Sequence, residues 1–336
     1  MRVSNEQRLQ SSAHSASSAK GRRGLSRYWR WGGALVVLVM LLVIAASCYM
    51  LHYALAPLQR SASEAYARLI DRTPQMQPWL QQEKGNLRDT TIIFEGKQLH
   101  AIYLPADTPT TCSAVLVHGY KDCSISMLHI GWLYHEHLGL NILLPDLSAH
   151  GQSDGDHIGM GWQERRQVAQ WAGVAADMWR NDSVPSRVVL HGVSMGAATV
   201  MDAAGDSLPT AVKAVIEDCG YTSAWDEFAG QMQEQFGLHE MPLLYTTSAL
   251  CRVRYGWSFG QASPITQVAK CHLPMLFIHG GNDTFVPTAM VHRLYAAKPQ
   301  PKALWIAPGS EHARAFTDHE HDYERVVRQF LDTYFY

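Results

Sequence analysis

The sequence predicts an α/β fold: a mostly parallel sheet with helices on both faces, preceded by one transmembrane helix. Two observations predict it. In residues 89–336, short apolar segments rich in β-branched residues alternate with helix-forming segments. This alternation is typical of parallel sheets, because each crossover needs a helix. Residues 31–59, by contrast, carry no Asp, Glu, Lys or Arg, and 34–51 are almost wholly aliphatic.

The N-terminal segments divide by charge. The first 30 residues hold seven basic side chains and one acid, Glu6. A helix over residues 32–56 would be about 37 Å long at about 1.5 Å per residue, enough to cross a hydrocarbon core of about 30 Å. Because basic flanks stay in the cytoplasm, we predict a basic cytoplasmic tail (1–31), a single transmembrane anchor (32–56) and an extracytoplasmic remainder.

A cleaved signal peptide is the alternative for the apolar segment. The small residues Ala-Ala-Ser-Cys at 45–48 resemble a cleavage site. A tail of about 30 residues is long for a signal peptide, which favours an uncleaved anchor. A buried core helix is also disfavoured, because nothing amphipathic interrupts the run.

Residues 57–88 are expected to form a juxtamembrane helix, around the polar stretch 63–70, followed by a linker that bears Pro and Gln. The α/β domain is expected over 89–336. It opens with two strands, 91–94 and 99–104, which a turn at 95–97 joins as an antiparallel hairpin.

The sequence Gly-Val-Ser-Met-Gly at residues 192–196 stands between a short apolar strand, 186–191, and a helix of small residues, 197–204. A serine on such a strand-to-helix turn is held in a strained conformation that exposes its hydroxyl. The flanking glycines are needed because side chains there would collide with the neighbouring backbone. The pattern predicts that Ser194 is a nucleophile, with a turn of no catalytic role as the alternative.

A nucleophilic serine needs a base, and the base needs a third group to fix its tautomer. Two later strands are each followed by a suitable side chain: Asp283 comes after 274–280, and His312 comes after 302–308. Because the carboxyl ends of parallel strands meet at one edge of a sheet, we predict that Asp283 orients His312 and that His312 is the base for Ser194.

Other residues compete for these roles. Asp218 also ends a strand, 214–217, and is the alternative acid. His279 precedes a glycine pair and is expected to be packed rather than catalytic, whereas His319 and His321 lie in a polar segment and are expected to be solvated.

Two backbone N–H groups are needed to stabilise the oxyanion of an acyl-transfer reaction. One is predicted to be that of Met195, directly after the nucleophile. The other is predicted to be that of Tyr120, in the turn His-Gly-Tyr that follows the strand 113–117. His118, in the same turn, is expected to be a structural hydrogen-bonding group.

Taken in order, these segments resemble the α/β-hydrolase superfamily, in particular its serine aminopeptidase and prolyl-oligopeptidase-like branch, which includes many small esterases. The resemblance covers about residues 89–336. The matching segments are 118–120, 146–153, the serine turn 192–196, 262–265, 280–287 and 309–312. The resemblance implies an α/β-hydrolase fold and a structural loop at 146–153. One departure is Ser148, where relatives often carry Arg.

The resemblance also implies a helical cap insertion, here at about 220–262. This segment is rich in large apolar residues: Trp225, Phe228, Met232, Phe236, Met241, Leu243, Leu244, Tyr245, Trp257 and Phe259. One interpretation is an apolar wall for substrate, and the other is a core for the insertion itself. We expect two or three of them to contact substrate.

Several classes of site and partner are not indicated. Beyond Cys48 in the anchor there are five cysteines, and an odd number leaves at least one thiol unpaired within the chain. No HExxH or comparable metal spacing occurs, so we predict no metal and no cofactor. The 21 basic and 29 acidic residues beyond the tail form no basic stripe, which argues against a nucleic-acid partner.

The sequence and the resemblance together predict a membrane-anchored serine hydrolase that cleaves a small-molecule carboxylic ester through an acyl-enzyme on Ser194. A serine peptidase or amidase with the same three residues is the first alternative. A catalytically silent, anchored binding protein is the second. Acyl transfer differs only in the group that deacylates the serine, so the residues alone leave it open.

Overall fold

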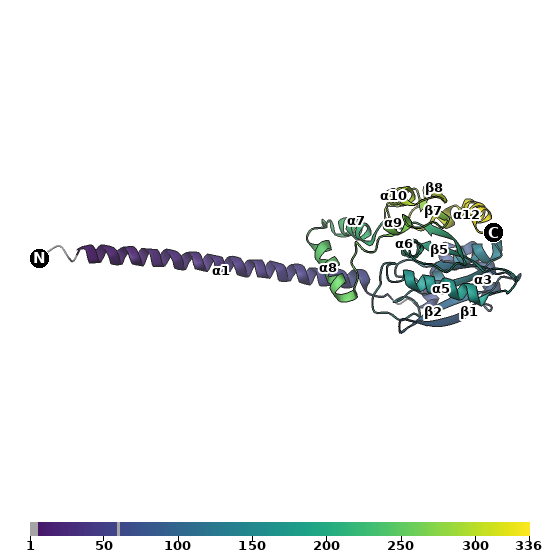
Figure 1. Ribbon diagram of the computed structural model, residues 1–336, viewed down its shortest axis with the longest axis horizontal. Helices are drawn as coiled ribbons and strands as arrows, with labels where there is room; N and C mark the ends of the chain where they lie inside the picture. The colour runs from purple at the N-terminus through teal and green to yellow at the C-terminus, as the bar shows by residue number, and fades with distance from the viewer. Residues whose placement is uncertain (1–5, 59–60) are drawn as a thin grey trace.

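The computed structural model describes residues 6–58 and 61–336, with side chains from residue 29 onward. The first five residues of the predicted cytoplasmic tail, and the side chains of the next 23, lie outside this description. Figure 1 shows helix α1 (Glu6–Leu55) leading from the N-terminus to the edge of an α/β domain, where it meets helices α7 (Ala224–Phe236) and α8 (Leu243–Tyr255).

A single eight-stranded sheet organises the domain, in the order β1-β2-β4-β3-β5-β6-β7-β8. β1 and β2 are antiparallel to their neighbours, and all other pairs are parallel. This confirms the predicted mostly parallel sheet. The strands are β1 (Arg88–Phe94), β2 (Lys97–Leu104), β3 (Cys112–Val117), β4 (Asn141–Pro145), β5 (Arg187–Val193), β6 (Val212–Asp218), β7 (Met275–Gly280) and β8 (Lys302–Ala307).

The hairpin at the start of the sheet is tighter than predicted. Phe94 pairs with Lys97, which leaves two turn residues instead of the expected three. Glu95 has φ 51° and Gly96 has φ 77°, so both central residues are left-handed. A two-residue turn of this kind matches the twist of the strands it joins, and this is why Lys97 belongs to β2.

Two apolar clusters lie on opposite faces of the sheet. In β3, Val115 and Val117 belong to one cluster and Ala114 and Leu116 to the other, as the two-residue period of a strand requires. The first cluster is covered by α5, α6 and α10, and the second by α2, α3, α4 and α12. These helices are α2 (Ala62–Arg72), α3 (Gln77–Glu83), α4 (Leu128–Trp132), α5 (Arg165–Met178), α6 (Met195–Ala204), α10 (Ala289–Ala297) and α12 (Glu320–Tyr334).

Short helical segments complete the chain. They are α9 (Pro264–Val268), α11 (Ala315–Asp318), η1 (Pro74–Met76), η2 (Ser124–Met127) and η3 (Leu133–His137). The expected linker within 57–88 is largely helical: η1 and α3 follow α2 directly. Met76, Trp79 and Leu80 are buried in the second cluster, so apolar contacts fix a segment whose Pro and Gln content had indicated an irregular linker.

The insertion between β6 and β7 consists mainly of α7 and α8. Each ends at a left-handed glycine, Gly237 and Gly256, which terminates the helix without steric cost. Met232, Leu244 and Phe259 are buried in the first cluster. The insertion therefore shares the core of the domain rather than forming one of its own.

The end of α1 is packed against this insertion. By length and composition, Trp29–Leu55 is a candidate membrane span. Ser47, Leu51 and Leu55, spaced by four residues along one helix face, are nevertheless buried against the domain. The Ser47 hydroxyl lies 2.5 Å from that of Thr246 in α8. The predicted anchor segment thus ends in about two turns that belong to the folded domain.

Candidate active site

Ser194 occupies the turn between β5 and α6 with φ 58° and ψ −119°. A side chain at residue 192 would collide with the backbone of Gly196, and one at residue 196 would collide with the carbonyl of Val117. Only glycine fits at both places, as the sequence pattern predicted. The close packing of α6 on the sheet holds Ser194 in a conformation that is strained for a residue with a side chain.

The structure brings the three predicted side chains into one line of hydrogen bonds. His312 Nε2 lies 2.9 Å from Ser194 Oγ. On the other side of the ring, His312 Nδ1 lies 2.7 Å from Asp283 Oδ2. With its proton on Nδ1, the imidazole donates to the carboxylate and presents the Nε2 lone pair to the hydroxyl. This is the arrangement a general base for serine requires.

Asp283 is held as a carboxylate. Its side chain is fully buried, its Oδ1 accepts a bond of 2.9 Å from the Val286 N–H, and its Oδ2 lies 3.3 Å from His279 Nε2. Burial alone would raise the pKa of Asp283, but the hydrogen bonds from His279 and His312 outweigh it and lower the pKa to about 2. His279, expected to be only packed, therefore also contacts the predicted acid.

The alternative acid has another partner. Asp218 lies at the end of β6, and its Oδ2 accepts a bond of 2.9 Å from the Tyr323 hydroxyl. Burial raises the pKa of Asp218 to about 6. Among the described residues, the ring nitrogens of His312 bond to Ser194 and Asp283 and not to Asp218.

The predicted oxyanion donors flank the serine. Met195 is the first residue of α6, where backbone N–H groups have no partner within the helix. The turn that carries Tyr120 also passes beside Ser194: a Cβ placed on Gly119 would lie 3.9 Å from Ser194 Oγ. Their role as donors stays a prediction.

His118 holds this turn in shape, as expected for a structural residue. The Leu147 N–H donates to His118 Nε2 at 3.0 Å, which leaves the Nδ1 proton to the carbonyl of Gly119 at 2.8 Å. The neighbouring loop at 146–153 is fixed by Asp146, which accepts bonds from the Ser124 and Gln152 N–H groups.

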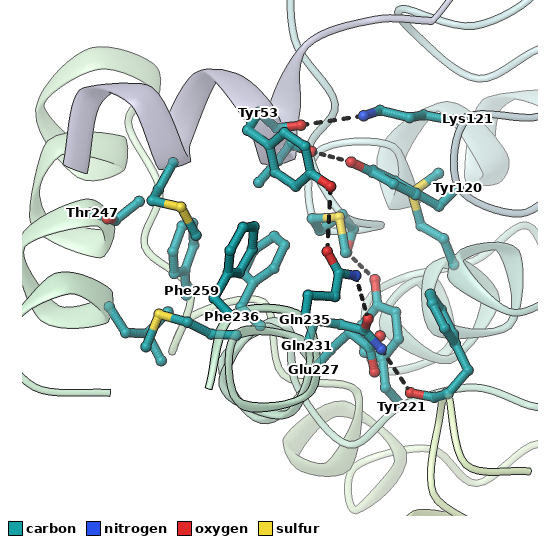
Figure 2. A pocket seen from close by; sticks show the side chains of 18 of the residues that line it. Tyr53, Tyr120, Lys121, Tyr221, Glu227, Gln231, Gln235, Phe236, Thr247 and Phe259 are labelled. Atoms are coloured by element: carbon teal, nitrogen blue, oxygen red, sulfur yellow. Dashed lines mark hydrogen bonds between the residues drawn. The ribbon is translucent and has the colours of Figure 1, made fainter. Parts of the chain in front are cut away.

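A hollow of about 930 Å³, counting space open to solvent, leads to Ser194. Figure 2 shows its wall, to which α7 contributes a polar column of Glu227, Gln231 and Gln235. Five of the insertion's large apolar residues line the hollow: Phe228, Met232, Phe236, Leu244 and Phe259. That two or three of the insertion's apolar residues contact substrate stays a prediction.

The end of α1 also lines this hollow, through Met50, Tyr53 and Ala54. The Tyr120 hydroxyl donates to the Ala54 carbonyl at 2.5 Å, and Lys121 Nζ donates to the Tyr53 carbonyl at 3.2 Å. Sequence reasoning missed this contribution. In a segment that is apolar throughout, no periodicity distinguishes the residues that face protein from those that face lipid.

Glu227 is a second residue of the hollow that the sequence analysis did not predict. It is 5% exposed, and its Oε2 has no hydrogen-bond partner among the described residues. Burial raises the pKa of Glu227 to about 8, so it carries a proton at neutral pH. A single acidic residue on an amphipathic helix is usually exposed, so the sequence pattern does not indicate that Glu227 is buried.

Among the residues that the structure describes, two groups of side chains have the spacing of metal ligands: Cys219 with Asp283 and His312, and Glu83 with Asp107 and His135. Neither offers a free imidazole nitrogen. His312 is engaged on both sides, while His135 accepts from Trp79 Nε1 at 3.2 Å and its Nε2 lies 3.0 Å from the Pro105 carbonyl. These groups are a poor match for a metal ion.

Comparisons with known proteins agree with this architecture. No family model matches the chain. The chain is 31% identical over 228 residues to the uncharacterized protein YqkD of Bacillus subtilis (strain 168), covering 68% of this chain and 73% of YqkD. It is 26% identical over 236 residues to the uncharacterized protein YfhR of Escherichia coli (strain K12), covering 69% of this chain and 75% of YfhR.

Among solved structures, the Pyrococcus furiosus esterase Pf2001 is similar with a TM-score of 0.60 and 20% identity, over 76% of this chain and 96% of the esterase. An acylaminoacyl peptidase is similar with a TM-score of 0.54 and 14% identity, over 73% of this chain and 41% of the peptidase. At these identities the likeness concerns the fold. With the serine turn, the sheet order and the relationship to YqkD, it shows that the chain belongs to the α/β-hydrolase superfamily.

Proposed function

We propose that the protein is a membrane-anchored serine hydrolase that cleaves a carboxylic ester through an acyl-enzyme on Ser194. One observation carries the proposal: His312 lies within hydrogen-bond distance of both Ser194 Oγ, at 2.9 Å, and a buried carboxylate, at 2.7 Å. The likeness of the fold to an esterase supports it.

The reaction follows from this geometry. Ser194 Oγ attacks the ester carbonyl while His312 Nε2 takes the hydroxyl proton, and Asp283 stabilises the resulting imidazolium. The N–H groups of Tyr120 and Met195 hold the oxyanion. His312 then returns the proton to the leaving alcohol. A water molecule attacks the acyl-enzyme and gives a proton to His312. His312 then returns that proton to Ser194 Oγ as the bond to the acyl group breaks, which releases the carboxylic acid and restores Ser194.

The hollow favours an ester over a peptide. Glu227 is the acid among the lining residues, and burial raises its pKa to about 8, so the lining offers no fixed negative charge at pH 7 to attract the charged N-terminus of a peptide. The rest of the lining is mainly apolar. Such a surface suits the hydrocarbon part of an ester.

Anchoring in a membrane is the second part of the proposal. Large apolar side chains of α1 from Leu35 to Leu42 are half or more exposed, and no described residue covers them. A continuous apolar surface of this length is stable in a bilayer and not in water. The basic tail supports an orientation with the N-terminus in the cytoplasm and the α/β domain outside.

Replacing Ser194 by Ala should abolish covalent labelling by a fluorophosphonate and lower esterase kcat by at least about 10³-fold, because no other side chain replaces the nucleophile. The exposed Ser207 offers the matched control: Ser207→Ala should label like wild type. Undiminished labelling of a folded Ser194→Ala protein would refute the assignment.

Asp283→Asn should lower kcat by up to about 10⁴-fold, because the amide no longer fixes the Nδ1 proton of His312. Asp218→Asn should cost far less, since Asp218 bonds to Tyr323. The measurement is kcat for an ester, with circular dichroism to verify folding. The reverse order of effects would identify Asp218 as the acid.

The raised pKa of Glu227 predicts that activity is lost at alkaline pH. Because burial raises its pKa to about 8, the side chain is neutral below that pH and charged above it. The charge disfavours an apolar substrate, so kcat/KM should fall as pH rises through about 8. Glu227→Gln should lack this fall, whereas Glu234→Gln, exposed on the same helix, should keep it. An unchanged profile in Glu227→Gln would contradict the prediction.

The anchor predicts a defined topology. Protease added to intact cells should digest the α/β domain while leaving the N-terminal tail protected, and mass spectrometry of the membrane fraction should detect peptides from residues 1–31. Digestion of the domain only after lysis would mean the opposite orientation. Absence of the N-terminal peptides from the mature protein would mean a cleaved signal peptide.

A further inference from the structure

The membrane-spanning helix and the serine share one hollow. Met50, Tyr53 and Ala54 of α1 line the same space as Ser194. They are held there from two sides: Tyr120 and Lys121 donate to the carbonyls of Ala54 and Tyr53, and the Tyr53 hydroxyl donates to Gln235 of α7 at 3.3 Å. Figure 2 shows α1 crossing over the hollow between these partners. The anchor thus forms part of the pocket wall.

The wall has two sides of different character. In Figure 2 the polar column of α7 runs from Glu227 to Gln235 and ends at Tyr53, with Phe236 and Phe259 beside it. The apolar side is rich in methionine and phenylalanine: Met50, Met160, Phe228, Met232, Leu244 and Phe259. Methionine side chains adapt to irregular apolar shapes, so this side fits a flexible hydrocarbon chain.

The length of the free part of α1 places this hollow at the membrane surface. Because Ser47 is buried in the domain, the part of the span outside it runs from Trp29 to Ala46. These 18 residues are about 27 Å long at about 1.5 Å each, close to the hydrocarbon thickness of about 30 Å. Little of the bilayer therefore separates the end of the span from the insertion.

The insertion is suited to this position. Exposed apolar side chains lie on it and on the adjoining turn of α1: Tyr49, Met241 (70% exposed), Tyr245 and Val253 (87% exposed). Arg252 and Arg254, both exposed, flank Val253. Apolar and aromatic tips next to basic residues are typical of protein surfaces that rest among lipid headgroups.

We infer that the substrate is an ester of a long-chain fatty acid resident in the bilayer, and that the last two turns of α1 form the wall that guides its chain to Ser194. The inference rests on the proposed ester hydrolysis. A chain that follows α1 from the bilayer into the hollow exchanges one apolar environment for another, so it avoids the cost of exposing each methylene to water, about 0.8 kcal/mol.

The test compares two esters with the same leaving group, p-nitrophenyl palmitate and p-nitrophenyl butyrate, on the full-length protein in phosphatidylcholine nanodiscs. The wild type should prefer palmitate. Ala54→Trp fills the hollow from α1 and should lower the palmitate-to-butyrate ratio of kcat/KM by about tenfold or more, as expected when part of a chain no longer fits. Ala45→Trp, at an exposed position on the same helix, should keep the wild-type ratio.

A second pair of variants distinguishes the proposed effect from misfolding of the Ala54→Trp protein. Met50→Ala removes an apolar contact without adding bulk and should lower the same ratio several-fold, while Met40→Ala, exposed on α1, should not change it. Fluorophosphonate labelling shows that Ser194 and His312 remain assembled. An unchanged ratio in both Ala54→Trp and Met50→Ala would overturn the inference and leave ester hydrolysis standing. No turnover of either ester by wild type would overturn both proposals.

Discussion

The close contact between the start of α6 and the sheet is the constraint on which the rest of the site depends. Gly196 lies against the carbonyl of Val117, and Gly192 lies against Gly196. No side chain fits between these backbones, so the chain must turn sharply, and the turn leaves Ser194 at φ 58° with its hydroxyl toward His312. The same contact brings the turn after β3 beside the serine. Backbone packing, rather than side-chain chemistry, thus sets the geometry of the candidate site.

The parallel sheet and the three residues of the candidate site were predictable from the sequence, because both depend on local sequence patterns. Buried parallel strands appear as short apolar runs, and side chains that follow their carboxyl ends meet at one edge whatever the loops between them do. This is why the sequence predicts that Ser194 and Asp283, which lie 118 and 29 residues before His312 along the chain, meet that histidine. The parallel order of β3 to β8 follows from the same alternation of strands and helices.

The features that the sequence did not predict depend on tertiary contacts, which produce no local sequence pattern. Burial of Glu227 results from the packing of α7 on the domain core, through residues such as Met232, and the neighbours of Glu227 in sequence do not reveal it. Trp79 and Leu80 turn an expected linker into α3 by packing on the domain. Likewise, a uniformly apolar helix gives no indication that Ser47, Leu51 and Leu55 face protein. Each case is a tertiary contact that overrides a local preference.

The hydrogen bonds at the end of α1 have a mechanical consequence. The Ala54 carbonyl accepts a bond from Tyr120, the residue whose N–H is the predicted second oxyanion donor. The helix therefore cannot tilt or slide along its axis without pulling on that turn. Mismatch between a span and its bilayer costs a fraction of a kcal/mol per Å and is relieved by tilting. For α1 anchored as proposed, the thickness of the surrounding membrane would act, through the hydrogen bond of the Ala54 carbonyl, on the position of Tyr120 beside Ser194.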